Sequence, residues 1–226
     1  MTPYASNTKG AYKMFEIARV VDPKIGYVEV CMEDGLYENP IRDWDHIPDV
    51  MLAPKYRGLA TLDDDPRDYS IREISERYAL HGGLALPVFA YDHSGVSFST
   101  SNDYPYNDPW DAGIAGIAYV SPEKARAEWG ENLTPQELRE KCRNSIKSLV
   151  SLMNAVAAGE CYCVTWYDTE CNAVDSCGGF WKTEDYTYEE MFQDMAEYAP
   201  EEYQPLFKRL EMGRIDPINV AKRLIA

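Results

Sequence analysis

The chain has 226 residues, 45% of them hydrophobic and 27% charged, which suffices for a buried core and argues against wholesale disorder. Its 38 Asp and Glu residues outnumber its 22 Lys and Arg residues, giving a formal net charge of -16. Because this charge repels nucleic acid and anionic membranes and attracts basic proteins, direct binding of DNA, RNA or a membrane is disfavoured.

The N-terminal segment has no long apolar run behind a basic start, so neither a signal peptide nor a transmembrane helix is predicted. A cytoplasmic location is the resulting expectation. Cysteines at such a location are expected to be reduced thiols. The chain has six of them: Cys31, Cys142, Cys161, Cys163, Cys171 and Cys177.

The first predicted element is a hairpin. Apolar runs over residues 14–21 and 25–32 flank Asp22-Pro23-Lys24, where proline removes a donor from the strand ladder and favours a turn. Residues 33–69 are rich in Asp, Pro, Gly and Arg. They predict a long irregular connection, a kind of segment that is often functional or mobile.

A helix and a second hairpin are predicted next. Ser70 and Glu73 form a capping box, which predicts a short helix after the serine. Apolar runs over 84–91 and 96–100 predict two strands joined by a turn, and a further strand is expected over 114–120.

A long amphipathic helix is predicted over 134–158. It begins at a capping box of Thr134 and Glu137 and carries apolar residues at helical spacing, which are expected to pack on a sheet. The predicted stripe consists of Leu138, Cys142, Ile146, Leu149, Val150, Met153 and Val156. Strands are predicted after it over 161–167 and 173–181.

These elements predict an α+β fold with a mostly antiparallel sheet covered by one long amphipathic helix and with a helical acidic C-terminal appendage. The predicted domains are a core over residues 1–182 and the appendage over 183–226. Residues 183–207 contain eight acidic residues and no Lys or Arg. Two short helices are expected there, and a last helix is expected over 216–224.

Two segments carry the residues best suited to chemistry. If residues 91–95 and 109–113 are adjacent, then Asp92, His93 and Asp111 converge as candidate catalytic residues for general acid–base work. In the alternative interpretation Asp92 caps the turn, His93 bonds to a backbone carbonyl, and the glycines adopt unusual backbone angles. Residues expected to shape these and neighbouring motifs are Tyr91, Gly95, Trp110, Gly113, Gly116 and Asp175.

No cofactor and no metal are predicted. The three histidines lack metal-ligand spacing, paired Cys-x-x-Cys knuckles are absent, and no phosphate-binding or dinucleotide-binding motif occurs.

The acidic C-terminal segment predicts a surface for a partner. Carboxylates spaced along helices can imitate the phosphates of a duplex, and aromatic side chains serve as anchors in protein interfaces. The alternative is an ordinary solvated helix face. The predicted partner-binding residues are Glu184, Asp185, Glu189, Glu190, Asp194, Glu197, Glu201, Glu202, Tyr188 and Tyr198.

Four motifs in the same order resemble a family of uncharacterised proteins encoded by bacteriophages and mobile elements. They are residues 38–45 (ENPIRDWD), 86–95 (LPVFAYDHSG), 109–116 (PWDAGIAG) and 175–180 (DSCGGF). The chain departs from that family at Asn107-Asp108, where members carry a Ser-Cys pair, and it continues beyond the last motif. The resemblance implies a phage-encoded accessory protein that acts in the cytoplasm of a host cell.

Charge and resemblance together predict an acidic inhibitor of a host defence system, of the anti-CRISPR or anti-restriction type. Its expected partner is a host protein with a basic nucleic-acid-binding surface, and DNA mimicry is one way in which the chain could engage it. No contact with nucleic acid or a membrane is expected. A non-enzymatic role is thus favoured. The alternative is an enzyme or nucleotide-binding protein that uses Asp92, His93 and Asp111, and a third interpretation is a virion assembly protein.

Overall fold

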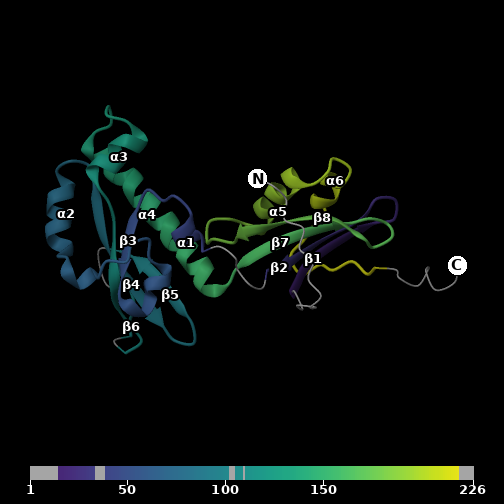
Figure 1. The fold of residues 1–226 in the computed structure, drawn as a ribbon, viewed down its shortest axis with the longest axis horizontal. Helices are drawn as coiled ribbons and strands as arrows, with labels where there is room; N and C mark the ends of the chain where they lie inside the picture. Colours follow the sequence, from purple (N-terminus) through teal and green to yellow (C-terminus); the bar gives the residue numbers. More distant parts are fainter. Residues whose placement is uncertain (1–14, 34–38, 102–104, 109, 219–226) are drawn as a thin grey trace. The chain divides into compact units, whose positions relative to one another are not determined.

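The computed structural model describes residues 15–33, 39–101, 105–108 and 110–218, and these form an α+β fold (Figure 1). The chain divides into two compact units. The terminal unit comprises Met1–Leu36, Cys161–Phe180 and Tyr186–Ala226, and the central unit comprises Tyr37–Glu160 and Trp181–Asp185. The predicted boundary between residues 182 and 183 does not coincide with this division, and each unit contains its own sheet in place of the one sheet expected.

The central unit is built on a four-stranded antiparallel sheet in the order β3-β6-β4-β5. Its strands are β3 (Asp49–Leu52), β4 (Leu84–Asp92), β5 (Val96–Thr100) and β6 (Ala112–Val120). Its helices are α1 (Pro40–Asp43), η1 (Pro54–Leu59), η2 (Pro66–Asp68), α2 (Ile71–Ala79), α3 (Pro122–Trp129) and α4 (Pro135–Ala158). Strand β3 lies inside the segment for which an irregular connection was predicted.

Helices α2 and α4 cover opposite faces of this sheet (Figure 1). Successive strand residues point to opposite faces, so Leu86 and Val88 pack in the cluster with α4, whereas Ala85 packs in the cluster with α2. The helix predicted over 134–158 is confirmed: the capping box of Thr134 and Glu137 is present, and α4 ends at Gly159, which has a left-handed φ of 70°. Its predicted stripe is buried except for Val156, which is half-buried.

The terminal unit contains a second four-stranded sheet in the order β1-β2-β7-β8. Its strands are β1 (Phe15–Asp22), β2 (Gly26–Met32), β7 (Cys161–Tyr167) and β8 (Ala173–Trp181), and its helices are α5 (Tyr188–Tyr198) and α6 (Gln204–Phe207). Strand β2 pairs with both β1 and β7 in antiparallel register. The first segment of the chain and a late hairpin therefore form one sheet.

A separate C-terminal appendage is not confirmed. Helices α5 and α6 are present, but the apolar face of α5, with Met191, Phe192 and Met195, is buried in the same cluster as Val28 and Val30 of β2. Burying these side chains stabilises the unit, because each large apolar side chain removed from water contributes about 1.5–3 kcal/mol. The last predicted helix, over 216–224, lies mostly outside the described residues, and residues 216–218 are not helical.

Three of the four sheet edges are covered by other parts of the same unit. In the central unit, the side-chain amide of Asn154 on α4 bonds to the edge strand β5: its Oδ1 accepts from the Phe98 N–H at 2.7 Å, and its Nδ2 donates to the Phe98 carbonyl at 3.0 Å. At the other edge, the Val50 carbonyl of β3 accepts from the N–H groups of Thr61 and Leu62, both at 3.1 Å.

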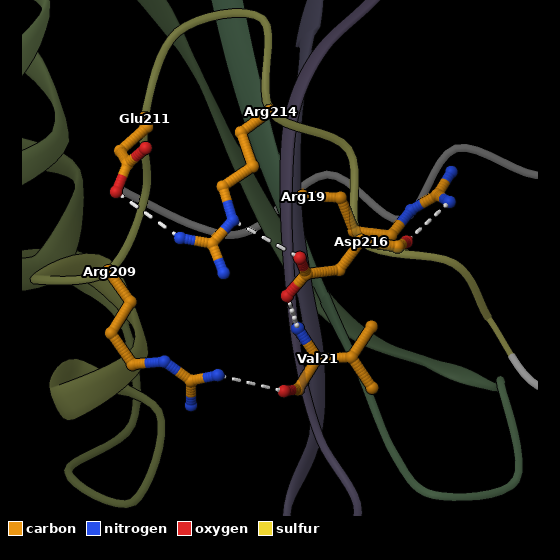
Figure 2. A network of polar contacts seen from close by, with 6 residues as sticks. All are labelled: Arg19, Val21, Arg209, Glu211, Arg214 and Asp216. Carbon is orange, nitrogen blue, oxygen red and sulfur yellow. Dashed lines mark hydrogen bonds and ion pairs between the residues drawn. The ribbon is translucent and has the colours of Figure 1, made fainter.

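The third covered edge is β1 in the terminal unit, along which a C-terminal segment runs in parallel (Figure 2). The Gly213 N–H donates to the Ile17 carbonyl at 2.8 Å, the Arg19 N–H donates to the Arg214 carbonyl at 2.9 Å, and the Asp216 N–H donates to the Arg19 carbonyl at 3.1 Å. We call residues 213–216 the edge strap.

Side chains reinforce the edge strap (Figure 2). The Asp216 carboxylate accepts from the Val21 N–H at 3.2 Å and from Arg214 Nε at 3.2 Å, while Arg209 donates to the Val21 carbonyl at 3.2 Å. The hydrogen bond from Val21 and the neighbouring Arg214 guanidinium hold the pKa of the Asp216 carboxyl below its usual range.

We expect Asp216→Ala to lower the free energy of unfolding by about 1–2 kcal/mol at neutral pH, because it removes the charged acceptor from the Val21 N–H. Urea denaturation measures the change. Since the folded pKa is depressed, the contribution is complete above an unfolded pKa of about 3.9 and is lost as the pH falls through the folded value. Glu211→Ala is the control: its exposed carboxylate only pairs with Arg214, so a change within about 0.5 kcal/mol is expected. Equal losses for the two variants would contradict this role of Asp216.

Candidate functional site

The structure brings the two candidate segments side by side at one end of the central sheet. Tyr91 of β4 is in register with Ala112 of β6, and just beyond it the Asp92 N–H donates to the Asp111 carbonyl at 2.8 Å. The turn after β4 has its left-handed residue at Ser94, with a φ of 56°, and not at Gly95. Neither Gly95 nor Gly113 has a positive φ, contrary to the structural interpretation of these two glycines.

The three candidate catalytic side chains do not converge on one another, because only His93 and Asp111 form a pair. His93 Nδ1 lies 2.7 Å from Asp111 Oδ2. The Asp92 carboxylate instead forms an ion pair with Lys55 and accepts from the Tyr56 hydroxyl at 3.0 Å. Asp92 is therefore not part of a single carboxylate–imidazole set with the other two residues.

Lys55 and Tyr56 are functional candidates that the sequence did not indicate. They lie in η1, far from Asp92 in the chain, and a Lys-Tyr dipeptide in an irregular segment gives no signal of such a contact. Hydrogen bonds from Lys55 and Tyr56 lower the pKa of the Asp92 carboxyl, which keeps it ionised. Burial, and then the hydrogen bond to Asp92, raise the pKa of Tyr56.

A shallow cavity of about 260 Å³ lies beside these pairs and is lined by Lys55, Tyr56, Asp92, Trp110 and Asp111. The Trp110 side chain is 92% exposed at this cavity. Carboxylates beside an open aromatic ring suit a small polar ligand with hydroxyl or amino donors and a planar face.

The other residues predicted to shape the motifs have distinct structural roles. Tyr91 stacks with Tyr106 and with His93, with ring centroids 5.6 and 6.2 Å away. A Cβ at Gly116 would lie only 2.0 Å from the Met51 carbonyl oxygen, so glycine permits β3 and β6 to pair. Asp175 of β8 accepts a hydrogen bond from the Ser176 N–H at 2.8 Å.

The predicted acidic surface is divided between the two units. Glu184 and Asp185 belong to the central unit, and the other predicted partner-binding residues belong to the terminal unit. All eight carboxylate residues are exposed. Of the two tyrosines, Tyr198 is 63% exposed and Tyr188 is half-buried, with its hydroxyl 3.1 Å from that of Tyr162.

Most carboxylates of this surface form no ion pair within the described part of the chain. Among the ion pairs of the described residues, none involves Glu189, Asp194, Glu197, Glu201 or Glu202. Two side chains of the surface also have local roles. The Asp194 carboxylate accepts from the Tyr186 hydroxyl at 2.5 Å, and Glu190 completes the capping box at Thr187 that begins α5.

The six cysteines are free thiols, four of them buried. Burial raises the pKa of Cys142 to about 11 and that of Cys161 and Cys163 to about 12, so these thiols are poor nucleophiles at neutral pH. Within the described part of the chain, no group of three or more His, Cys, Asp or Glu side chains is placed to hold a metal ion.

The chain matches no protein-family model, no curated protein and no solved structure. None of the helices in the described ranges combines the length and the apolar character needed to cross a membrane.

We expect Lys55→Met to raise the pKa of the Asp92 carboxyl toward its ordinary value of about 3.9, because it removes the strongest hydrogen bond that favours the charged form. Carbon-detected NMR titration of the Asp92 carboxyl measures the shift. Lys208→Met removes the same charge from an exposed site in the other unit and should leave that pKa unchanged. An Asp92 pKa that does not respond to Lys55→Met would show that the pair is absent in solution.

Proposed function

We propose that the chain is a phage-encoded acidic inhibitor of a host defence system, which binds a basic, nucleic-acid-handling protein surface through α5 and the residues that follow it. The observation that carries this proposal is a set of five exposed carboxylates on and directly after α5 that form no ion pair with the described residues: Glu189, Asp194, Glu197, Glu201 and Glu202. Elsewhere in the terminal unit, carboxylates such as Glu29 and Asp216 lie against arginines.

The spacing of these carboxylates supports nucleic-acid mimicry. Glu190, Asp194 and Glu197 follow one another at intervals of four and three residues and so share a face of α5. At a rise of about 1.5 Å per residue, Glu190 and Asp194 are separated by roughly 6 Å along the helix axis. Along one DNA strand, alternate phosphates are about 6.8 Å apart. Arginines that bind a row of phosphates are therefore suited to this face of α5.

An exposed aromatic ring at the end of α5 can add short-range contacts to the electrostatic attraction of a partner. Tyr198 ends α5 and packs edge-on against Phe180, with ring centroids 5.8 Å apart, so its ring is held in place while it stays open to solvent. Fixed aromatic side chains are favoured as interface anchors because little conformational entropy is lost when they bind.

We expect the triple variant Glu189→Gln, Asp194→Asn, Glu197→Gln to weaken binding to the partner by roughly ten- to a hundredfold, through loss of charge complementarity. The partner is isolated from host lysate, identified by mass spectrometry and titrated with the purified chain by calorimetry. Wild-type binding should weaken as salt rises, and duplex DNA should compete with the chain.

A second triple variant, Asp68→Asn, Glu128→Gln, Glu140→Gln, changes the net charge equally at exposed sites of the central unit and should bind like wild type. Capture of no nucleic-acid-handling protein, or equal binding by both triple variants, would sink the proposal.

A second candidate function is supported by the cavity beside Trp110: binding or turnover of a small polar ligand such as a nucleoside or nucleotide. The 2.7 Å pair of His93 and Asp111 supplies a positioned imidazole, and Asp92 and Asp111 line the cavity as hydrogen-bond acceptors. Because those carboxylates repel phosphate, the base and ribose are the parts of the ligand that fit best.

For this candidate we expect adenosine and guanosine to change the fluorescence of Trp110, with the response lost in Trp110→Phe and weakened in Asp111→Asn. No response to any nucleoside or nucleotide at millimolar concentration would rule the candidate out.

A further inference from the structure

Strand β6 extends beyond its neighbour β3 and is paired there on one side only. The register between β3 and β6 ends at Gly116. One further bond follows, from the Ala53 N–H to the Ala115 carbonyl at 2.7 Å, before the chain turns into η1. On its other side β6 stays paired with β4 as far as Ala112. In the part of the chain that the structure describes, no segment pairs with residues 112–114 on the side of β3, and we call these residues the open segment of β6.

The register with β4 shows which backbone groups of the open segment face away from β4. The Asp92 N–H donates to the Asp111 carbonyl at 2.8 Å, so the Ala112 N–H, which points the opposite way in the same trans peptide, faces away from β4. Hydrogen-bonded and non-hydrogen-bonded pairs alternate, so the next residue bonded to β4 is Gly113. The Ala112 carbonyl and the Ile114 N–H lie in the two peptide groups that flank Gly113 and therefore also face away. No residue of the open segment has a positive φ that would interrupt this alternation.

The cavity of about 260 Å³ lies against the same segment, because residues 112–114 line it together with Asp92 and Asp111. Gly113 lies opposite Ala90 of β4, which also lines the cavity. Residues that face each other across an antiparallel pair direct their side chains to the same face of the sheet. A residue of an added strand opposite Gly113 would therefore direct its side chain into the cavity. A Cβ at Gly113 would meet no atom within 4 Å, so this face of the open segment is unobstructed.

The charges at the cavity favour a basic side chain, and an arginine in particular. Two carboxylates, Asp92 and Asp111, line the cavity together with one cation, Lys55. The Trp110 side chain is 92% exposed beside them and offers a ring face on which a guanidinium can stack. The formal net charge of -16 adds a long-range attraction for a basic segment.

We propose that the open segment of β6 binds an extended peptide of a partner protein, which adds as a strand antiparallel to β6 and continues the course of β3. A peptide residue opposite Ala112 exchanges two hydrogen bonds with it, and a peptide residue opposite Ile114 accepts from the Ile114 N–H. The residue between these two is an arginine whose side chain enters the cavity. Ile114 is 72% exposed and suits an apolar side chain opposite it, so the recognised sequence is an apolar residue, an arginine and any third residue.

This inference goes beyond the proposed function, because the open segment belongs to the central unit and the carboxylates of α5 belong to the terminal unit. It also assigns the cavity a different occupant from the second candidate function. A nucleoside would use the carboxylates and Trp110, whereas a peptide strand also requires the outward backbone groups of β6. The experiment therefore addresses those backbone groups.

The test is calorimetric titration of the full chain with the capped heptapeptide Lys-Ser-Val-Arg-Thr-Ser-Lys at roughly 0.15 M salt, which screens non-specific attraction. We expect saturable binding. Methylation of the threonine nitrogen removes the donor to the Ala112 carbonyl but leaves the charge and the side chains unchanged, and should weaken binding by roughly tenfold or more. Replacement of the arginine of the peptide by glutamine should weaken binding by a similar factor, roughly tenfold, through loss of the charge that faces Asp92 and Asp111.

Two variants of the chain test the same geometry. Ala112→Pro removes an outward N–H while the ladder with β4 is kept, so it should weaken peptide binding by roughly tenfold, whereas Ala112→Ser keeps the N–H and should bind like wild type. Gly113→Leu fills the cavity where the arginine would enter and should abolish binding. Gly58→Leu is the matched control, because its Cβ also meets no atom within 4 Å and Gly58 does not line the cavity, so it should bind like wild type.

No binding of the parent peptide at a concentration of roughly 2 mM would overturn the proposal. Equal binding of the parent and the N-methylated peptide would also overturn it, because it would show long-range attraction by an acidic chain in place of strand addition.

Discussion

Backbone groups on the edge strands of a sheet need hydrogen-bond partners, and this requirement accounts for much of the long-range structure of the chain. At β1 the partner is the edge strap of residues 213–216, which ties the last described residues to the first strand. At β5 it is a single amide, Asn154, whose oxygen and nitrogen imitate a neighbouring strand. The edges left by antiparallel pairing therefore determine where the C-terminal segment lies and how α4 is fixed to its sheet.

The carboxylates of the chain also differ in whether a cation lies beside them. Some carboxylates that hold backbone or side chains in place lie beside cations, as Asp216 does with Arg214 and Asp92 with Lys55. On α5, Glu190 caps the helix and Asp194 accepts from Tyr186, whereas Glu189 and Glu197 form no ion pair with the described residues. The helix is held mainly by its buried apolar face. Mutual repulsion along that helix is a cost to stability, and a basic partner would relieve it. The proposed function is therefore supported by the position of these carboxylates on α5, and not by the acidic composition alone.

The sequence predicts the elements better than their assembly. The capping box at Thr134 and the apolar spacing after it suffice to predict α4, and the hairpins of β1–β2, β4–β5 and β7–β8 follow from local turn residues. No local sequence signal marks the pairing of β2 with β7, so the division of the strands into two sheets was not predicted. Strand β3 is too short to stand out, and the contact of Tyr56 with Asp92 depends on tertiary packing that no motif encodes.

One ring contact inside the terminal unit joins the acidic helix α5 to strand β8. Phe180 near the end of β8 packs against Tyr198 at the end of α5. The contact restricts the Tyr198 ring although the residue is 63% exposed. An anchor that is already ordered loses less conformational entropy when a partner binds, so β8 contributes to the proposed binding surface by ordering this ring.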